Sequence, residues 1–501
     1  MSSSIILSGI LSVVSSPVNI LVIAFGVFVG IIFGSIPGLS AVMAVCLFLP
    51  ISFGMDAVTG ISLLLGLYIG GISGGLISAI LLKIPGTPAS VATVFDGGPM
   101  MERGEGGKAI GAGILYSFIG GILSLIALIF ISPLLAKVAI KFSSVEYASI
   151  TIFSLSVIAS LSGKKPLLGA VSGFIGLLFS CVGTGPIEET LRFTFGIKAL
   201  DTGFNSTSIM IGFFALASVF DFASDYHNEI AKPNIQSAKI KGYGISFKEF
   251  VENLKATIIA CLVGLGIGIL PGIGGGTACM VSYSVVQNAS KTPEKFGTGH
   301  LEGLIASEAA NNATTGGAMV PMLTLGIPGS ATAAMLMSGL MIHNVSPGPL
   351  IFKTNGKMMY AIFTAMLVAN VVMLFMERFL LPIFVKLLSV PKQILLPCVV
   401  VMCALGVYSA RHIYFDVVMM FVFGIIGLLF KKAKMPTNPC IIGFILGSGF
   451  EKYFRRVFIN NSGDGSSFFT SPISLVFLIA AVAFIALPII RGRKAKKAAK
   501  A

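Results

Sequence analysis

The sequence is poor in charge and contains no tryptophan. Only 11% of its 501 residues are charged, whereas 55% are hydrophobic. A soluble domain of this length could not bury so much apolar surface in one core, so the composition favours a protein that uses lipid as its solvent. Without tryptophan, any aromatic belt at a membrane surface must come from the ten tyrosines and some of the 39 phenylalanines.

Motifs of catalysis and metal binding are also missing. The chain has no Walker loop, no paired His-Glu metal motif and no serine nucleophile elbow. The seven cysteines stand singly in apolar sequence, so we expect reduced packing residues, and the four histidines lack metal-ligand companions. These absences argue against a membrane-embedded enzyme and predict no cofactor. The energy for any transport must therefore come from an ion gradient or from another subunit.

Apolar stretches long enough to span a bilayer recur along the chain. A spanning helix needs about 20 mainly apolar residues. Examples are residues 18–33, 110–131, 256–270, 361–376 and 473–490. We therefore predict an all-α, multi-pass membrane protein with roughly ten to twelve membrane segments. Residues 1–17 contain no lysine or arginine and no cleavage pattern follows them, so we expect no cleaved signal peptide.

The positive charge is concentrated in two places. The formal net charge of +14 comes largely from the tail at 491–497 and from lysines around the stretch 225–250. On the positive-inside rule both segments are expected to face the cytoplasm, and we expect a multi-pass protein of an inner membrane. We expect no nucleic-acid partner, because the charge is explained by membrane topology.

An internal repeat organises the chain. The motif GSIPGL at 34–39 returns as GILPGI at 268–273, and further matches follow in the same order. The matched pairs are 34–39 with 268–273, 84–87 with 327–330, and 173–179 with 424–430. The small drift in spacing is expected for two copies of one fold. We predict a first membrane repeat at 1–224, a cytoplasmic linker at 225–250, a second repeat at 251–462, and a final membrane helix with its basic tail at 463–501.

The two repeats are expected to have inverted topology. The linker before the second repeat is basic, whereas the segment before the first span is uncharged, so equivalent first helices enter from opposite sides. Inverted repeats are characteristic of secondary transporters, in which substrate and coupling ions bind near the bilayer midplane between the halves.

Pro-Gly motifs interrupt apolar sequence at matched positions in both repeats. They lie at 36–40, 84–90, 270–277 and 327–332. Proline stops a helix, glycine permits unusual backbone conformations, and serine or threonine can cap a new helix. One isolated Pro-Gly would be read as a proline kink, but four symmetric occurrences favour broken or re-entrant helices at the midplane. Helix N-termini there suit a carboxylate, and freed carbonyls suit a cation such as sodium.

These arguments give two sets of candidate site residues. The substrate set is Gly86, Thr87, Pro88, Ser90, Gly329, Ser330, Thr332, Asn311 and Asn312. The coupling-ion set is Gly38, Ser40, Gly272, Gly274 and Thr277. Two neighbouring charges stay ambiguous: Glu308 is either a proton or cation partner or a residue at a helix end near water, and Lys83 either attracts an anion or reaches to the membrane interface.

The motifs resemble those of the large membrane subunit of tripartite tricarboxylate transporters. The resemblance rests on residues 34–39, 83–90, 97–108, 308–317 and 326–330 and covers nearly the whole chain. It implies a symporter, driven by a sodium or proton gradient, that receives citrate or another tricarboxylate or dicarboxylate from a periplasmic solute-binding protein. It also implies a smaller membrane subunit as partner.

One rival interpretation is a self-sufficient ion-coupled carboxylate carrier or antiporter that needs no binding protein. A channel is disfavoured, since it would need a continuous polar or charged lining and the chain has few intramembrane charges. A periplasmic binding protein and a small membrane protein encoded in adjacent genes would favour the tripartite interpretation.

Overall fold

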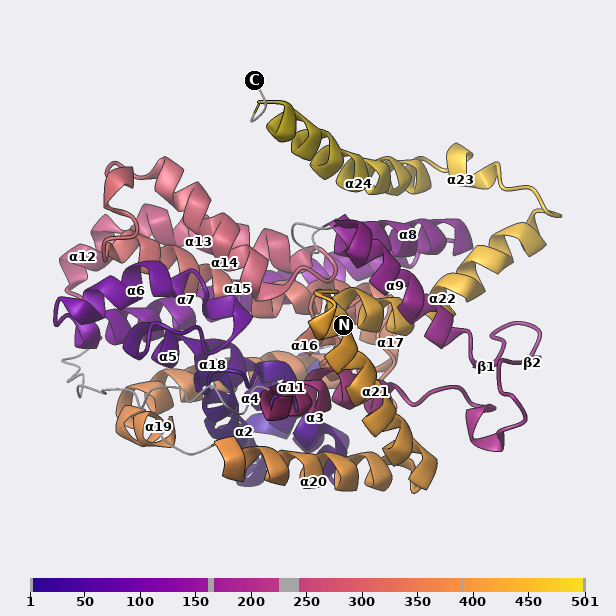
Figure 1. Ribbon diagram of the computed structural model, residues 1–501, viewed down its shortest axis with the longest axis horizontal. Helices are drawn as coiled ribbons and strands as arrows, with labels where there is room; N and C mark the ends of the chain where they lie inside the picture. The colour runs from indigo at the N-terminus through magenta and orange to yellow at the C-terminus, as the bar shows by residue number, and fades with distance from the viewer. Residues whose placement is uncertain (1–2, 161–165, 225–242, 389–391, 499–501) are drawn as a thin grey trace. The chain divides into compact units, whose positions relative to one another are not determined.

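The structure is all-α. The computed structural model describes residues 3–160, 166–224, 243–388 and 392–498 (Figure 1). The strands in these ranges are two short ones, β1 (Gly183–Thr184) and β2 (Leu191–Arg192), which pair antiparallel. The predicted fold class is thereby confirmed.

Long apolar helices carry the predicted membrane segments. In the described ranges, six helical stretches are long and apolar enough to cross a membrane. They are Pro17–Ser35, Ala57–Leu81, Gly106–Ala139, Ser206–Ser224, Gly356–Phe379 and Tyr414–Lys432. Shorter apolar helices accompany them, among them Leu254–Ile269 and Pro472–Ala486. The number of crossings stays a prediction.

The chain forms two compact units, and each combines segments from both halves of the sequence. Unit 1 comprises Met1–Ala136, Ser218–Ile269 and Ile273–His412, and unit 2 comprises Lys137–Ala217, Leu270–Gly272 and Ile413–Ala501. The predicted repeats divide the chain along its sequence, whereas these units divide it by contacts in space. The repeat boundaries therefore stay a prediction. Most of the linker, including Lys239, and the side chains of the basic tail lie outside the described residues.

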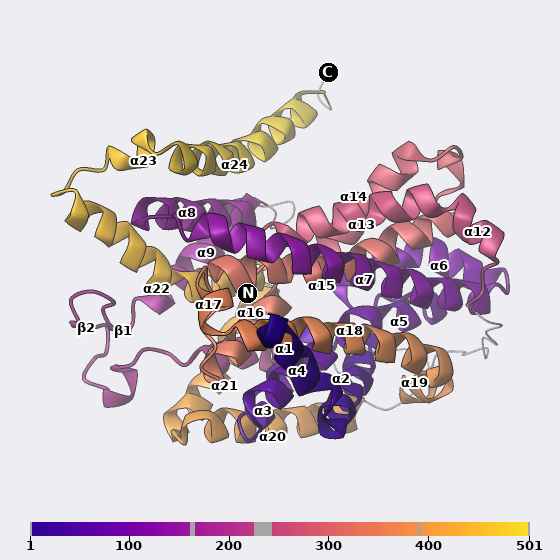
Figure 2. The ribbon, with the colours of Figure 1, turned by 180° about the vertical axis from the view of Figure 1, so that it is seen from behind.

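Unit 1 contains the interrupted helices. Its elements are α1 (Ser3–Val14), α2 (Pro17–Ser35), α3 (Ala41–Ser52), α4 (Ala57–Ser73), α5 (Gly75–Leu81), η1 (Pro88–Ser90), α6 (Thr93–Glu102), most of α7 (Gly106–Ala139) and of α11 (Ala217–Ser224), α12 (Phe247–Glu252), α13 (Leu254–Ile269), α14 (Gly274–Ala289), η4 (Pro293–Lys295), α15 (Leu301–Leu325), α16 (Ala331–Ile342), α17 (Ile351–Thr354), α18 (Gly356–Phe379), α19 (Leu381–Leu387) and α20 (Lys392–Arg411). Helices α13, α14 and α15 pack side by side, as both views show (Figure 2).

Unit 2 is a smaller helical bundle. Its elements are α8 (Ser144–Ser160), α9 (Pro166–Ser180), β1, β2, η2 (Lys198–Leu200), α10 (Ser206–Ile211), η3 (Gly212–Leu216), α21 (Tyr414–Lys432), α22 (Thr437–Asn460), α23 (Ser467–Thr470) and α24 (Pro472–Ala498). Helix α22 packs against α8 and α9. Arg192 of the hairpin donates two hydrogen bonds to the Glu451 carboxylate of α22, at 2.6 and 3.0 Å, which fixes the hairpin to the bundle.

Matched glycines pack the repeats in the same way. Gly30 of α2 lies against α4, where an added Cβ would be 2.5 Å from the carbonyl oxygen of Leu67. Its counterpart Gly264 of α13 lies against α15, where a Cβ would be 2.3 Å from the carbonyl oxygen of Ala310. Small residues let membrane helices approach backbone to backbone. These matched contacts support the internal repeat, whereas the inverted orientation stays a prediction.

The chain returns from the linker onto the start of α7. Glu249 of α12 forms an ion pair with Lys108 and accepts a 2.8 Å hydrogen bond from the backbone of Ser246. The Lys108 ammonium and the Ser246 N–H lower the pKa of the Glu249 carboxyl to about 2, despite some desolvation. The second repeat is therefore anchored where it begins.

Candidate functional site

The helix breaks lie where the Pro-Gly motifs predict them. Helix α2 ends at Ser35 and α3 begins at Ala41, and Ser40 caps α3 by accepting a hydrogen bond from the backbone of Met43 at 3.3 Å. The second copy of this motif separates α13 from α14. At the later motifs, a short 3₁₀ turn, η1, separates α5 from α6, and Ser330 caps α16 after the end of α15. The helix–break–helix pattern is confirmed at all four places.

Motifs from both repeats meet inside unit 1. An added Cβ on Gly276 would lie 3.0 Å from the carbonyl oxygen of Pro88, and one on Gly275 would lie 2.7 Å from Asn311 Oδ1. Gly274 lies beside Ser330, with 3.7 Å between an added Cβ and the serine Cβ. We call this set the central junction. It comprises Tyr68, Pro88–Ser90, Gly274–Gly276, Asn311 and Ser330.

The first turn of α14 brings polar backbone to the central junction. Ser40 caps α3, but its counterpart in the repeat is Gly274, and α14 has no side-chain cap. The first N–H groups of a helix have no intrahelical partner and carry a partial positive charge. The start of α14 can therefore receive an anion.

Asn311 presents an unpaired oxygen to the same place. The residue is fully buried in α15 and its Nδ2 donates to the carbonyl oxygen of Ile72 at 3.2 Å, but Oδ1 has no hydrogen-bond partner. An unsatisfied buried polar atom costs about 1 to 3 kcal/mol. A ligand hydroxyl, protonated carboxyl or cation at the central junction would recover this cost.

Tyr68 completes the junction. It is fully buried in α4, and its hydroxyl lies near the side chain of Ser330. The Ser330 Oγ also accepts from the backbone of Ala333 at 3.1 Å. Sequence reasoning missed Tyr68 because the stretch around it is rich in glycine and reads as helix packing.

The other predicted substrate residues lie close by or serve as structural supports. Thr87 and Ser90 bond to each other, since the Thr87 N–H donates to Ser90 Oγ at 3.3 Å. Thr332 is buried in the first turn of α16. Asn312 donates to its own helix, at the Glu308 carbonyl oxygen, and its Oδ1 is unpaired.

Gly86 and Gly329 hold the breaks against neighbouring backbone. A Cβ on Gly86 would lie 2.3 Å from the Gly34 carbonyl oxygen, and one on Gly329 would lie 2.4 Å from the Gly268 carbonyl oxygen. The two sets of contacts are equivalent under the repeat. These glycines are required by close packing, which supports the junction rather than lining it.

The predicted coupling-ion residues do not form one cluster in the described contacts. Gly38 is exposed in the α2–α3 break, and Ser40 acts as a helix cap. Gly272 precedes α14, and Thr277 lies half-buried one turn inside it. Of this set, Gly274 lies in the central junction. In the described ranges, no group of three histidine, cysteine, aspartate or glutamate side chains could hold a metal ion.

The structure shows the surroundings of both charged residues. Glu308 lies about two turns inside α15 and is fully buried, so it is not at a helix end near water. Lys83 adopts the left-handed conformation (φ 54°), as does its counterpart Gly326 (φ 71°), and its ammonium forms a half-exposed ion pair with Glu102. Lys83 therefore ends a helix and neutralises a neighbouring carboxylate.

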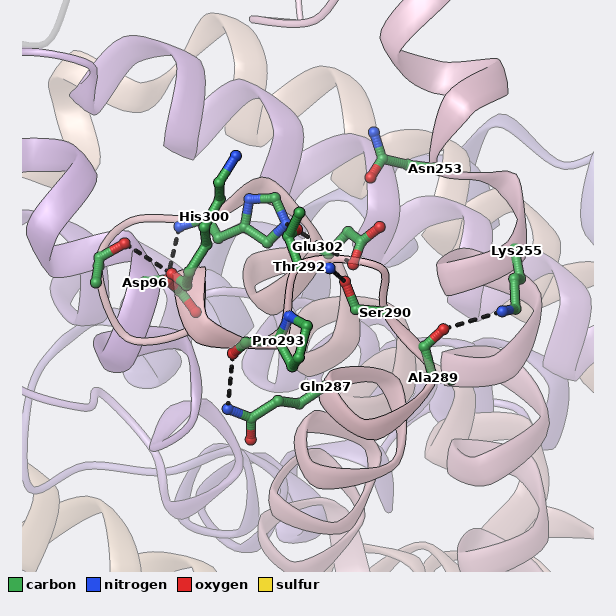
Figure 3. Close-up of polar contacts among 12 residues, drawn as sticks. Asp96, Asn253, Lys255, Gln287, Ala289, Ser290, Thr292, Pro293, His300 and Glu302 are labelled. Carbon is green, nitrogen blue, oxygen red and sulfur yellow. Dashed lines mark hydrogen bonds and ion pairs between the residues drawn. The ribbon is translucent and has the colours of Figure 1, made fainter.

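Asp96 anchors the start of α15, a role that sequence reasoning missed. Its buried carboxylate accepts hydrogen bonds from the Tyr283 hydroxyl at 2.7 Å and from the backbone N–H of Gly297, Gly299 and His300 at 3.0, 2.8 and 2.6 Å. Figure 3 shows it pointing at the His300 backbone, beside the contact of His300 with Thr292. The long polar helix is thus fixed in position at its first turn.

Comparisons with known proteins find sequence relatives over most of the chain. The model of the family described as "Tripartite tricarboxylate transporter TctA family" matches residues 20–442. A protein of Agrobacterium vitis, described as the uncharacterized 52.8 kDa protein in the TAR-I ttuC' 3' region, is 33% identical over 96% of this chain and 96% of its own length. A second protein, from the TAR-II ttuC' 3' region of the same organism, is 33% identical over 46% of this chain and 96% of its own length. No solved structure matches the chain.

Proposed function

Because this chain belongs to the tripartite tricarboxylate transporter TctA family, we propose that it imports a small carboxylate anion through the bacterial inner membrane as an ion-gradient-driven symporter. The anion, a tricarboxylate or dicarboxylate, is handed over by a periplasmic solute-binding protein, and a smaller membrane subunit completes the transporter. The family assignment supports the transporter component, and the central junction supports the anion.

The uncapped first turn of α14 carries this proposal. It brings free N–H groups and the positive end of a helix dipole to a place lined by the unpaired Asn311 Oδ1. A hydroxyl-bearing or partly protonated carboxylate would use both features, since its carboxylate accepts from N–H groups and its hydroxyl donates to an oxygen. Ser330 and Pro88–Ser90 bring the second Pro-Gly motif of each repeat to the same ligand.

Reconstituted uptake tests the proposed function. The chain is reconstituted with and without the small membrane protein and solute-binding protein encoded beside it, and radiolabelled citrate uptake is measured under an imposed proton or sodium gradient without ATP. We expect uptake when all three proteins and a gradient are present. Full uptake by the chain alone would favour a self-sufficient carrier, and uptake that depends on ATP alone would contradict gradient coupling.

Asn311→Ala is expected to weaken the apparent affinity for the transported anion. Removing an oxygen that binds a buried ligand group costs about 1 to 3 kcal/mol, or roughly 5- to 150-fold in KM. The matched control is Asn253→Ala, because Asn253 bonds to the Glu249 backbone at the end of α12, outside the junction. An unchanged KM in Asn311→Ala, with the protein at normal abundance, would remove this residue from the site.

A further inference from the structure

Glu308 is a buried carboxyl that forms no ion pair with a cation in the part of the chain that the structure describes. It lies about two turns inside α15, and its Oε2 accepts a hydrogen bond from Ser117 Oγ of α7 at 2.9 Å. Its Oε1 contacts the Thr93 hydroxyl of α6. An ionised carboxylate at this depth is costly unless it is paired with a positive charge.

A row of hydroxyl groups continues from Oε1. Thr93 Oγ1 lies 3.1 Å from Ser307 Oγ, and Ser307 Oγ lies 3.0 Å from the Leu304 carbonyl oxygen. The row therefore has three contacts in series, from the carboxyl through two hydroxyls to a carbonyl. The carbonyl oxygen at its end can only accept.

Counting hydrogens along this row favours a proton on Glu308. Three hydrogen bonds need three hydrogens, and the hydroxyls of Thr93 and Ser307 supply one each. With an ionised carboxylate, the threonine hydrogen is used on Oε1 and the serine hydrogen on Leu304, so the contact between the two hydroxyls has none. With a protonated carboxyl, Oε1–H donates to Thr93, Thr93 donates to Ser307, and Ser307 donates to the carbonyl. All three contacts are then satisfied.

The surrounding charges agree with a neutral carboxyl. Two titratable groups of the described ranges, Cys279 of α14 and Glu377 of α18, interact electrostatically with Glu308, and neither is a cation. Glu377 itself accepts from Ser73 at 2.9 Å. The charged side chains of α6, of the first turn of α7 and of the first turn of α15 have partners of their own: Asp96 with the 297–300 backbone, Glu102 with Lys83, Lys108 with Glu249, and Glu302 with His300.

We propose that Glu308 binds the proton whose uptake and release couple anion transport to the proton gradient. This coupling role rests on the proposed function, whereas the bound proton rests on the hydroxyl row alone. On release, the proton passes to water when the site opens, and the remaining carboxylate accepts from Thr93 and Ser117. Between the two states the Thr93 hydroxyl turns its hydrogen from Ser307 to Oε1, whereas Ser307 keeps its hydrogen bond to the Leu304 carbonyl oxygen.

Infrared spectroscopy of the purified full chain in lipid tests the bound proton independently of any substrate. At neutral pH the difference between wild type and Glu308→Gln is expected to contain the C=O band of a protonated carboxyl that shifts in D2O. Thr93→Val keeps the carboxyl but removes its acceptor, so this band is expected to move to higher frequency. The control Glu302→Gln is expected to leave it unchanged. A difference spectrum with ionised carboxylate bands alone would overturn the proposal.

Transport tests the coupling. In vesicles that contain the chain and its partners, an imposed pH gradient is expected to drive citrate accumulation in wild type and in Glu302→Gln, but about tenfold less in Glu308→Gln. Equal accumulation in Glu308→Gln, or wild-type uptake that follows sodium alone, would overturn the coupling role and leave the carrier function intact. If wild type takes up no citrate under any gradient, the proposed function fails, and the infrared band still decides whether Glu308 holds a proton.

Discussion

Gly86→Ala and Gly329→Ala are each expected to reduce transport to background. The added methyl would lie 2.3 Å from the Gly34 carbonyl oxygen in the first case, and 2.4 Å from the Gly268 carbonyl oxygen in the second. Because both obstacles are backbone atoms, no side chain can turn away, and the broken segment itself must shift. Overpacking of this kind costs about 3 kcal/mol. The larger consequence is functional, since the segment that shifts carries η1 or the start of α16 to the central junction.

Citrate uptake and thermal stability measured on the same preparations test this expectation. The matched control is Gly266→Ala in α13, where nothing lies within 4 Å of an added Cβ. Near-normal uptake in both variants would show that the breaks tolerate displacement, and the central junction would then need another explanation. A loss of protein from the membrane, without a stable remainder to measure, would mean that the glycines serve folding before transport.

Asp96→Ala is expected to cause the largest loss of stability of any single change on α6. The substitution leaves three backbone N–H groups at 297–300 and the Tyr283 hydroxyl without their acceptor. Since each buried group left unsatisfied costs about 1 to 3 kcal/mol, and some will find water, a net loss of about 3 kcal/mol or more is expected. The start of α15 would loosen, and with it the placement of Asn311.

Thermal unfolding followed with a thiol-reactive dye provides the measurement, because five cysteines are buried in the folded chain. The control is Glu102→Ala, which removes an exposed ion pair of less than about 1 kcal/mol. Asp96→Asn keeps one acceptor oxygen and should fall between the two. If Asp96→Ala unfolds at the same temperature as Glu102→Ala, the hydrogen bonds around Asp96 contribute little to the free energy of unfolding.

The helix breaks could be predicted from sequence because their causes are local. The proline of each motif ends the helix that precedes it, and Ser40 and Ser330 cap the helices that follow them. The repeat could also have predicted the backbone conformation of Lys83. Gly326 stands opposite Lys83, and a glycine at a helix end signals the left-handed conformation that the structure shows for both residues.

The contacts of the site could not be predicted because their partners are far apart in sequence. In the sequence Asp96 is a single acidic residue before two glycines. The backbone N–H groups that donate to its carboxylate lie in a loop some 200 residues later. Glu308 stood out in the sequence as a carboxyl in apolar surroundings. Its contacts with the hydroxyls of Thr93 and Ser117, however, depend on which faces of α6 and α7 are turned toward α15. A pattern of apolar residues sets which helices are buried, not which small polar groups face one another.

The backbone contacts of α2 with α4 and of α13 with α15 also bear on how stability varies with temperature. Gly30 and Gly264 hide almost no side-chain surface, and their helices associate within lipid rather than leaving water. The large heat-capacity change of unfolding in soluble proteins arises from apolar surface that becomes hydrated. Separation of these helix pairs inside a bilayer exposes little apolar surface to water, so its free energy should vary almost linearly with temperature. Cooling should therefore stabilise the helix contacts of unit 1, whereas it would weaken a core held together by the hydrophobic effect in water.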